Sequence, residues 1–534
     1  MTDLDVLDKA DPDTRIEHLD VLIIGAGLSG VGAARHIQDQ CPWASFALLE
    51  ARDSIGGTWD LFRYPGIRSD SDMFTLGYSF RPWRGEKAIA DGADILDYIK
   101  DTASEAGIDD LVRFGHRVLS ADWSEAEARW TVVAERTAAD TDSDPVTGSN
   151  PGPGADLSNP AVDASLEIVT LTCDFLFSCT GYYRYDHGYL PDFKGMESFD
   201  GQIVHPQQWP EDLDYSGRSV VVIGSGATAM TLVPSMAPTA AHVTMLQRSP
   251  TYVMSLPAKN PTADLIRRYL PERISGPLVK WMLALGAIGL YQLSKRRPAF
   301  VKRVIRKQTV AALPQGYDVD THFTPTYDPW DQRLCVVPDG DLFKAISEGS
   351  VDIVTDRIVE FTPEGLLLES GVELDADIIV TATGLEMLFI GGMQLSIDGT
   401  PIDPSDRLTY KGMMLEGVPN FAVAFGYTNA SWTLKADLTS DYACRVLNHM
   451  REGDYDRCVP VNSDSDDESL PLLGLTSGYV QRAAGQFPKQ GGKFPWQVHQ
   501  NYVRDYRAMK LRSVVDDSMQ FSKSTQHQLV RART

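Results

Sequence analysis

The sequence has few cysteines and no long apolar run. Its six cysteines are scattered and form no Cys-x-x-Cys pair, so neither a disulfide framework nor a zinc or other metal site is expected. No stretch of about eighteen apolar residues occurs, so a membrane-spanning helix is not expected. The acidic N-terminal segment lacks the apolar centre of a signal peptide. These absences together predict a cytoplasmic protein.

Positive charge is also scarce. The 534-residue chain has 49 Lys and Arg against 73 Asp and Glu, and its formal net charge is −24. A nucleic-acid partner would need a basic face, so none is expected. One segment departs from this pattern, because the apolar residues 281–293 are followed by basic residues up to 307. Two interpretations stay open for 281–307: weak association with a membrane surface, or a packed helical insertion with a solvated basic face.

Two glycine-rich loops each follow a short apolar segment. The first reads Gly25-Ala-Gly-Leu-Ser-Gly30 and the second reads Gly224-Ser-Gly-Ala-Thr-Ala229. A helical pattern and a second apolar segment, at 46–50 and at 242–248, follow the respective loops. The order strand, turn, helix, strand is typical of a dinucleotide-binding fold. Two copies of it predict an α/β protein with two Rossmann-like domains.

The residues at the ends of the second strands differ in charge. Glu50 ends the strand after the first loop, where a carboxylate accepts hydrogen bonds from ribose hydroxyls and repels a 2′-phosphate. FAD has no 2′-phosphate, so the first loop is predicted to bind FAD. Arg248 and Ser249 occupy the matching place after the second loop, and an arginine there favours NADPH over NADH because it can clamp the 2′-phosphate. The alternative is a solvated arginine on a loop.

The predicted cofactor contacts follow from the two loops. Small residues let the backbone approach the pyrophosphate at a helix N-terminus. The predicted FAD contacts are Gly25, Gly27, Ser29, Gly30 and Glu50, and the predicted NADPH contacts are Gly224, Ser225, Gly226, Ala227, Thr228, Ala229, Arg248 and Ser249.

Changes in amino-acid composition along the chain indicate further segments and domain boundaries. Residues 137–165 are rich in Asp, Ser, Pro and Gly and are predicted to be a disordered insertion. Residues 258–325 have a helical pattern and interrupt the second dinucleotide unit. We therefore predict a discontinuous FAD-binding domain from residues 1–195 and 376–534, an NADPH-binding domain from 196–257 and 326–375, and a helical insertion at 258–325.

Three further segments carry a family resemblance. Residues 199–210 read F-x-G-x-x-x-H-x-x-x-W-P, with His205 at the histidine position, and residues 56–70 read G-G-x-W-x-x-x-x-Y-P-G-x-x-x-D. Both patterns resemble fingerprints of the Baeyer–Villiger monooxygenases, which are class B flavoprotein monooxygenases. Residues 328–335 resemble the segment that bears the active-site arginine in that family. The likeness runs from Asp20 to about Phe521, and residues 53–72, 427–437 and 488–492 together resemble one subgroup, which includes a monooxygenase that acts on thioamides.

The resemblance implies roles for individual residues. Arg333 and Asp70 are expected to be catalytic, with Asp70 also beside the flavin ring, because a fixed guanidinium charge stabilises a peroxide anion and an alkoxide. A structural Arg–Asp pair is the alternative. His205 is interpreted as fixing the linker between the nucleotide domains. The further flavin contacts that the resemblance implies are Gly57, Thr58, Trp59, Asp60, Leu61 and, at the adenine, Val118.

The activity that the resemblance implies is oxygen insertion. One atom of O2 would enter next to a ketone carbonyl, through a C4a-peroxyflavin, to give an ester or lactone, with FAD and NADPH as cofactors. Sulfides and thioamides are further candidate substrates, and a flavin-containing monooxygenase that oxygenates only N or S is the alternative. The absence of a spaced cysteine pair argues against a disulfide-reductase-type flavoenzyme. The joint presence of Arg333, Asp70 and the fingerprints argues against a nucleotide-binding redox sensor. Gln332 replaces a lysine that many members place at the NADPH phosphate, so the NADPH preference is expected to depend on Arg248 and Ser249.

Overall fold

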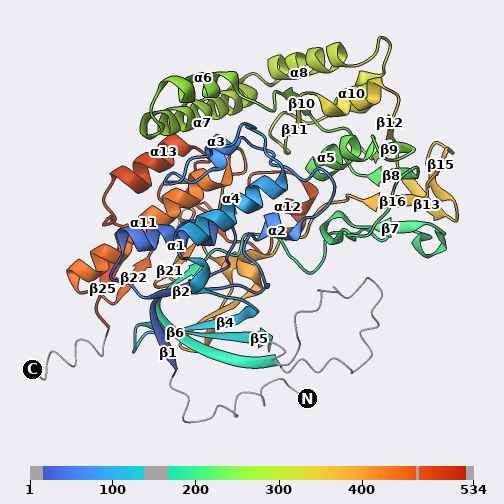
Figure 1. Cartoon of the computed structure of the whole chain (residues 1–534). Helices are drawn as coiled ribbons and strands as arrows, with labels where there is room; N and C mark the ends of the chain where they lie inside the picture. Colours follow the sequence, from blue (N-terminus) through green and yellow to red (C-terminus); the bar gives the residue numbers. More distant parts are fainter. Residues whose placement is uncertain (1–15, 138–165, 465–467, 525–534) are drawn as a thin grey trace, which may run out of the picture.

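The computed structural model describes residues 16–137, 166–464 and 468–524 (Figure 1). The insertion predicted at 137–165 lies outside the described residues except for Thr137, which ends a strand. Two sheets organise the rest of the chain, and a layer of helices covers one side of the molecule (Figure 1).

The larger sheet combines a parallel and an antiparallel part. Among the described residues its strands run in the order β18 (Thr400–Ile402), β17 (Gln394–Ile397), β4 (His116–Ser124), β5 (Arg129–Thr137), β6 (Leu166–Ser178), β1 (Glu17–Ile24), β2 (Phe46–Leu49) and β3 (Val112–Arg113), and β21 (Phe421–Val423) also pairs with β6. β1 is parallel to both β2 and β6, whereas β4, β5 and β6 are antiparallel to one another. Leu22 and Ile23 on β1 are fully buried, as expected for a parallel strand covered on both faces.

The second sheet is parallel throughout. Its described strands run in the order β12 (Val351–Thr355), β9 (His242–Gln247), β8 (Ser219–Ile223), β16 (Ile378–Thr381) and β7 (Gln202–Val204). Each predicted glycine loop lies between a parallel strand and a helix, α1 (Leu28–Gln40) after β1 and α5 (Ala227–Met236) after β8. The predicted α/β class with two Rossmann-like units is confirmed.

β16 differs from the predicted division of the chain. A boundary at residue 376 would assign it to the FAD-binding domain, but β16 hydrogen-bonds to β8 and β7 of the second sheet. The strand that closes a parallel sheet can come from any later part of the chain that returns to the sheet. Amino-acid composition does not show where that return occurs. We therefore propose that the second unit extends through Thr383, and that the chain rejoins the first unit at β17.

The helical insertion consists of α6 (Pro261–Tyr269), α7 (Glu272–Arg296), α8 (Pro298–Ala312) and α9 (Val319–Phe323). The Asn260 side chain caps α6 by accepting a hydrogen bond from the Ala263 N–H at 3.0 Å. In Figure 1, α6, α7 and α8 form the green layer along one edge of the molecule. Among the described helices, α7 alone has the length and apolar composition that could cross a membrane.

Each unit has an apolar core beneath its helices. The first lies around α1, α4 (Gly92–Glu105) and α11 (Trp432–Gly453), and the second packs α5 and α10 (Asp341–Ser347) on the parallel strands of the smaller sheet. The remaining described helices and strands are short: α2 (Thr58–Leu61), α3 (Met73–Leu76), β10 (Val253–Leu256), β11 (Cys335–Pro338), β13 (Ile358–Thr362), β14 (Gly365–Leu368), β15 (Glu373–Asp375), β19 (Thr409–Tyr410), β20 (Met414–Leu415), β22 (Arg457–Pro460), β23 (Leu470–Pro471), α12 (Gly478–Ala483), β24 (Lys489–Gln490), α13 (Tyr502–Tyr506) and β25 (Met519–Ser522).

Candidate active site

A pocket of about 1380 Å³ opens where the two units face each other. Gly25 and Gly27 of the first loop line it, and so do Ala227 and Thr228 at the start of α5. Open α/β sheets bind ligands at the carboxyl ends of their strands, and both loops leave their strands at that end. The pocket therefore reaches the helix start of both predicted dinucleotide sites.

The first loop has the geometry of a pyrophosphate cradle. The Gly25 N–H donates to the Leu49 carbonyl at 2.7 Å, and Gly25 has a φ of +99°, a conformation that favours glycine. A Cβ at Gly30 would lie 1.9 Å from the Gly25 carbonyl oxygen, so only glycine lets α1 start this close to β1. No side chain caps α1, which leaves its first N–H groups to a ligand. An anionic pyrophosphate fits such an uncapped helix start.

Glu50 supports this loop from the end of β2. Its side chain is buried, and its two carboxylate oxygens accept hydrogen bonds from the Ala26 N–H at 2.7 Å and from the Arg52 N–H at 3.0 Å. Glu50, Ser29 and Val118 all line the pocket. A carboxylate oxygen has two lone pairs, so Glu50 can fix the loop and still accept a ribose hydroxyl.

The second loop repeats the arrangement of the first. The Gly224 N–H donates to the Leu246 carbonyl at 2.8 Å, and a Cβ at Gly224 would lie 2.2 Å from the Ala382 carbonyl oxygen. No side chain caps α5. The Ser225 hydroxyl donates to the Ser249 carbonyl at 3.2 Å, which ties the loop to the segment that carries Arg248. Arg248 is exposed and has no ion-pair partner among the described residues.

Arg333 and Asp70 meet in the pocket although 263 residues separate them. The Arg333 Nη1 donates to the Asp70 Oδ2 at 2.8 Å, and Nη2 donates to the Tyr182 hydroxyl at 3.0 Å. The Arg333 Nε is buried and has no hydrogen-bond partner. The phenol groups of Tyr182 and Tyr479, together with Asp70, raise the pKa of the Arg333 guanidinium well above its usual range. The guanidinium is thus a fixed cation with a donor still unpaired, as an anionic reactant requires.

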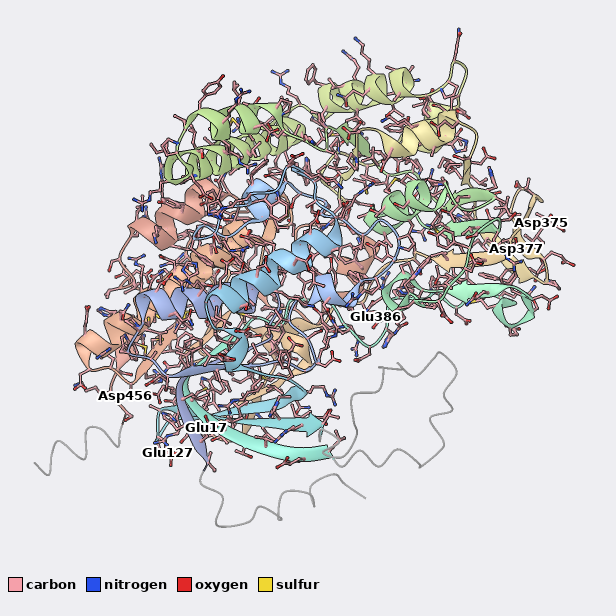
Figure 2. The ribbon with its side chains drawn as sticks, in the orientation of Figure 1. Glu17, Glu127, Asp375, Asp377, Glu386 and Asp456 are labelled. Atoms are coloured by element: carbon pink, nitrogen blue, oxygen red, sulfur yellow. The ribbon has the colours of Figure 1, made fainter. Side chains whose placement is uncertain are left out.

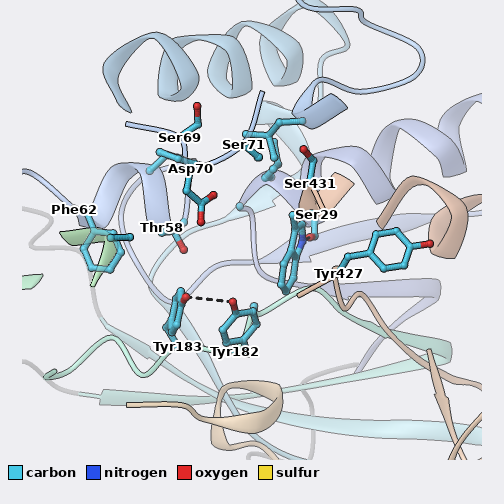
Figure 3. A pocket seen from close by; sticks show the side chains of 18 of the residues that line it. Ser29, Thr58, Phe62, Ser69, Asp70, Ser71, Tyr182, Tyr183, Tyr427 and Ser431 are labelled. Carbon is cyan, nitrogen blue, oxygen red and sulfur yellow. Dashed lines mark hydrogen bonds between the residues drawn. The ribbon is translucent and has the colours of Figure 1, made fainter. Parts of the chain in front are cut away.

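Aromatic residues that sequence reasoning missed form one wall of this site. The Tyr182 and Tyr183 hydroxyls are 3.2 Å apart, and Figure 3 shows both rings facing the space into which Asp70 points. The Tyr182 ring also packs on Trp432, whose Nε1 donates to the Ser29 hydroxyl at 2.7 Å. The sequence position of Tyr182 and Tyr183 could have identified them, because they directly follow Thr180-Gly181 at the end of β6.

The segment at 57–61 divides between the pocket and the protein interior. Gly57, Thr58 and Trp59 line the pocket. Asp60 does not, because its 3%-exposed side chain pairs with Arg52 and Arg63, each at 2.8 Å. Leu61 packs on the core of the second unit. These residues form the short helix α2, whose successive side chains point in different directions.

Several other predicted residues do not line the pocket. Gly30 and Ala229 are buried where their helices pack against the strands, which is the position for close packing rather than for ligand contact. The residues of the predicted set that do not line the pocket are Gly30, Asp60, Leu61, Gly224, Ser225, Gly226, Ala229, Arg248 and Ser249.

His205 joins the linker to the end of the second sheet. Its Nδ1 accepts from the Gln207 N–H at 3.2 Å, which leaves Nε2 to donate to the Gly384 carbonyl at 3.3 Å. Burial lowers the pKa of His205, so the neutral imidazole that these bonds require is favoured near neutral pH. Because both ring nitrogens are engaged in backbone bonds, the geometry suits the linker role that the sequence predicts.

Two uncapped helix starts on glycine loops, opening into one pocket with a fixed cation, define a protein that binds two dinucleotides side by side. Comparisons with known proteins agree. Residues 169–282 match a family model described as flavin-binding monooxygenase-like, and residues 23–84 match an NAD(P)-binding Rossmann-like domain.

The relatives extend over nearly the whole chain. The FAD-containing monooxygenase EthA of Mycobacterium tuberculosis is 51% identical over 95% of this chain and 98% of its own length. The probable FAD-binding monooxygenase AlmA of Acinetobacter baylyi is 45% identical over 95% and 97%. The chain therefore belongs to the family of FAD-containing monooxygenases, flavoenzymes that use NADPH.

Solved structures show the same fold. An oxidised steroid monooxygenase bound to NADP has a TM-score of 0.70 at 18% identity, covering 95% of this chain and 100% of that one. The complex of OTEMO with FAD and NADP has a TM-score of 0.65 at 22% identity, covering 84% and 87%. The arrangement of two dinucleotide units is thus shared at low sequence identity.

Proposed function

We propose that this monooxygenase carries out Baeyer–Villiger oxidation. A ketone, O2, NADPH and a proton would give an ester or lactone, water and NADP⁺, so that one oxygen atom enters the C–C bond beside the carbonyl. The observation that carries the proposal is Arg333, held by Asp70 and Tyr182 in the pocket that both loops line. We also propose that the protein acts in the cytoplasm.

The chain's own residues would bind and orient the two cofactors. The α1 start and Glu50 would hold FAD, with Gly57, Thr58 and Trp59 against the flavin, and the α5 start with Arg248 would hold NADPH. When bound, the reduced flavin supplies the activation of O2. Arg333 would stabilise the negative charge that develops on oxygen during attack on the carbonyl, and the aromatic wall would exclude water.

Product analysis tests this proposal. Purified enzyme with FAD, NADPH and O2 is given a cyclic ketone or a thioether, and the products are separated by gas chromatography. We expect lactone from the ketone, with NADPH consumed in equal amount. Sulfoxide formation without any lactone, across a panel of linear and cyclic ketones, would instead support the alternative N- or S-oxygenating activity.

The exposed Arg248 gives a second test. Arg248→Gln is expected to raise the KM for NADPH about 10- to 100-fold, because a charge-assisted hydrogen bond to the 2′-phosphate contributes about 1.5–3 kcal/mol. The KM for NADH should stay the same, since NADH has no such phosphate. Steady-state kinetics with both nucleotides measure the effect. An equal change for the two nucleotides would contradict the assignment of Arg248.

A further inference from the structure

The helix α7 is apolar on two opposite faces. Ile274, Leu278, Leu285 and Leu293 are spaced by four, seven and eight residues, so they share one face, and their exposed fractions are 56%, 45%, 52% and 40%. A surface helix of a water-soluble protein normally presents polar residues on that side. We call these four residues the outer stripe.

The opposite face of α7 forms part of the pocket. Leu283, Ala284, Ala287 and Leu290 line it. The Lys280 Nζ anchors this side by donating to the Gly77 carbonyl at 3.0 Å. One helix thus separates the proposed active site from the outer stripe. Because its inner face packs against protein, α7 lies along the surface rather than being surrounded by lipid.

The neighbouring helices extend the apolar surface. Leu265 and Tyr269 on α6 are 58% and 71% exposed, and Phe300 and Val304 on α8 are 53% and 40% exposed. Ten of the 21 large apolar residues that are exposed within the described ranges lie between residues 265 and 310. Clustering of this kind marks a surface that binds a partner.

The charge of this layer is opposite to that of the protein. Residues 259–312 contain twelve Lys and Arg and two acids, in a chain of net charge −24. Six of these cations have no carboxylate partner among the described residues, namely Arg268, Arg273, Arg296, Arg297, Arg303 and Lys307. The carboxylates labelled in Figure 2 all lie away from the α6–α8 layer. Exposed apolar residues beside unpaired cations match the chemistry of an anionic bilayer surface.

We propose that the α6–α8 layer docks on the surface of an anionic membrane, and that the pocket behind α7 takes a lipophilic ketone from that membrane. The outer stripe inserts among the acyl chains, and the unpaired cations contact the lipid phosphates. The substrate part of this inference rests on the proposed Baeyer–Villiger activity, whereas the docking part does not.

Vesicle sedimentation of the FAD-loaded enzyme tests the docking. We expect binding to phosphatidylcholine vesicles that contain phosphatidylglycerol, weaker binding without the anionic lipid, and a decrease with added salt. Arg296→Gln with Arg297→Gln should weaken binding about thirtyfold, because each cation near the surface contributes about 1 kcal/mol. Leu285→Glu with Leu293→Glu should abolish it. Val372→Glu, at a 50%-exposed valine in the β14–β15 hairpin, is the matched control and should bind normally.

Turnover separates docking from the proposed activity. For a long-chain ketone dissolved in the vesicles, Leu285→Glu with Leu293→Glu should raise the KM at least about tenfold, while a short water-soluble ketone should react as with the wild type. Wild-type enzyme that stays in the supernatant with anionic vesicles would overturn the inference. A dimer in light scattering that the same double variant splits would overturn it too, because a second copy would then cover the stripe. Binding to the vesicles without ester formation from either ketone would contradict the proposed Baeyer–Villiger activity and leave the membrane docking supported.

Discussion

Arg333→Met is expected to lower kcat for ester formation about 10²- to 10³-fold, the usual loss when a preorganised charge is removed from a water-poor site. The variant keeps an unbranched apolar stem but removes the guanidinium donors that reach Asp70 and Tyr182. Arg333→Lys should also be strongly impaired, since an ammonium group cannot hold both partners in one plane. Rates of ester formation under saturating NADPH and ketone measure the effect.

A milder variant distinguishes the effect of the Arg333 charge on kcat from the effect of aromatic packing. Tyr182→Phe keeps the ring contacts with Trp432 and removes one hydrogen bond to Arg333, so a loss of only about fivefold is expected. FAD content, read from the flavin absorbance, should be unchanged in all three variants, because neither side chain belongs to the pyrophosphate cradle. Ester formation by Arg333→Met at the wild-type rate would refute the assignment of this residue.

Lys435→Met is expected to lower the free energy of unfolding by about 3–5 kcal/mol, because it leaves a buried carboxylate without its cation. The Lys435 Nζ donates to the Asp505 Oδ2 at 3.0 Å and to the Lys411 carbonyl at 2.9 Å, and the paired side chains are 3% and 7% exposed. The Tyr427 hydroxyl donates to the same Asp505 oxygen at 2.7 Å, and Tyr427 lines the pocket. The loss should therefore appear both as a lower Tm and as weaker FAD retention.

Two further variants serve as controls for the effect of Lys435→Met. Lys435→Met combined with Asp505→Leu should recover much of the lost stability, because removing both charges removes the unpaired one. Lys259→Met breaks an ion pair with Glu86 at 2.6 Å whose side chains are 59% and 83% exposed, and its Tm should equal that of the wild type. Thermal unfolding followed by flavin fluorescence compares all four proteins. A wild-type Tm for Lys435→Met would show that the buried pair contributes nothing net.

Local patterns predicted the parts of this protein that depend on neighbouring residues. A glycine loop between an apolar strand and a helix is a local signal, because the turn, the helix start and the closing strand lie within a short stretch of chain. The role predicted for Glu50 rests on the same kind of local signal, since Glu50 follows the strand after the first loop. The division of the chain was harder to predict, because β16 pairs with strands from a distant part of the sequence.

The candidate site shows the same distinction. Arg333 and Asp70 were assigned through their resemblance to a family, and no spacing rule brings residues 263 positions apart into contact. Tyr182 was missed because its role depends on where Arg333 lies, and Asp60 was assigned to the flavin although its side chain turns toward Arg52. The direction in which a side chain points is set by tertiary packing and cannot be inferred from the order of residues.

The sequence by itself determined that this chain forms two dinucleotide units, because glycines and helix starts act over a few positions, and the residues that end the second strands predict ligands of different charge. Only the tertiary structure decided what surrounds Arg333 and what α7 does. The guanidinium gains Asp70 and Tyr182 from two distant segments, and α7 presents one apolar face to the pocket and another to the outside. An apolar helix has the same composition whether its partner is a core, a substrate or a membrane, and only its place in the fold distinguishes them.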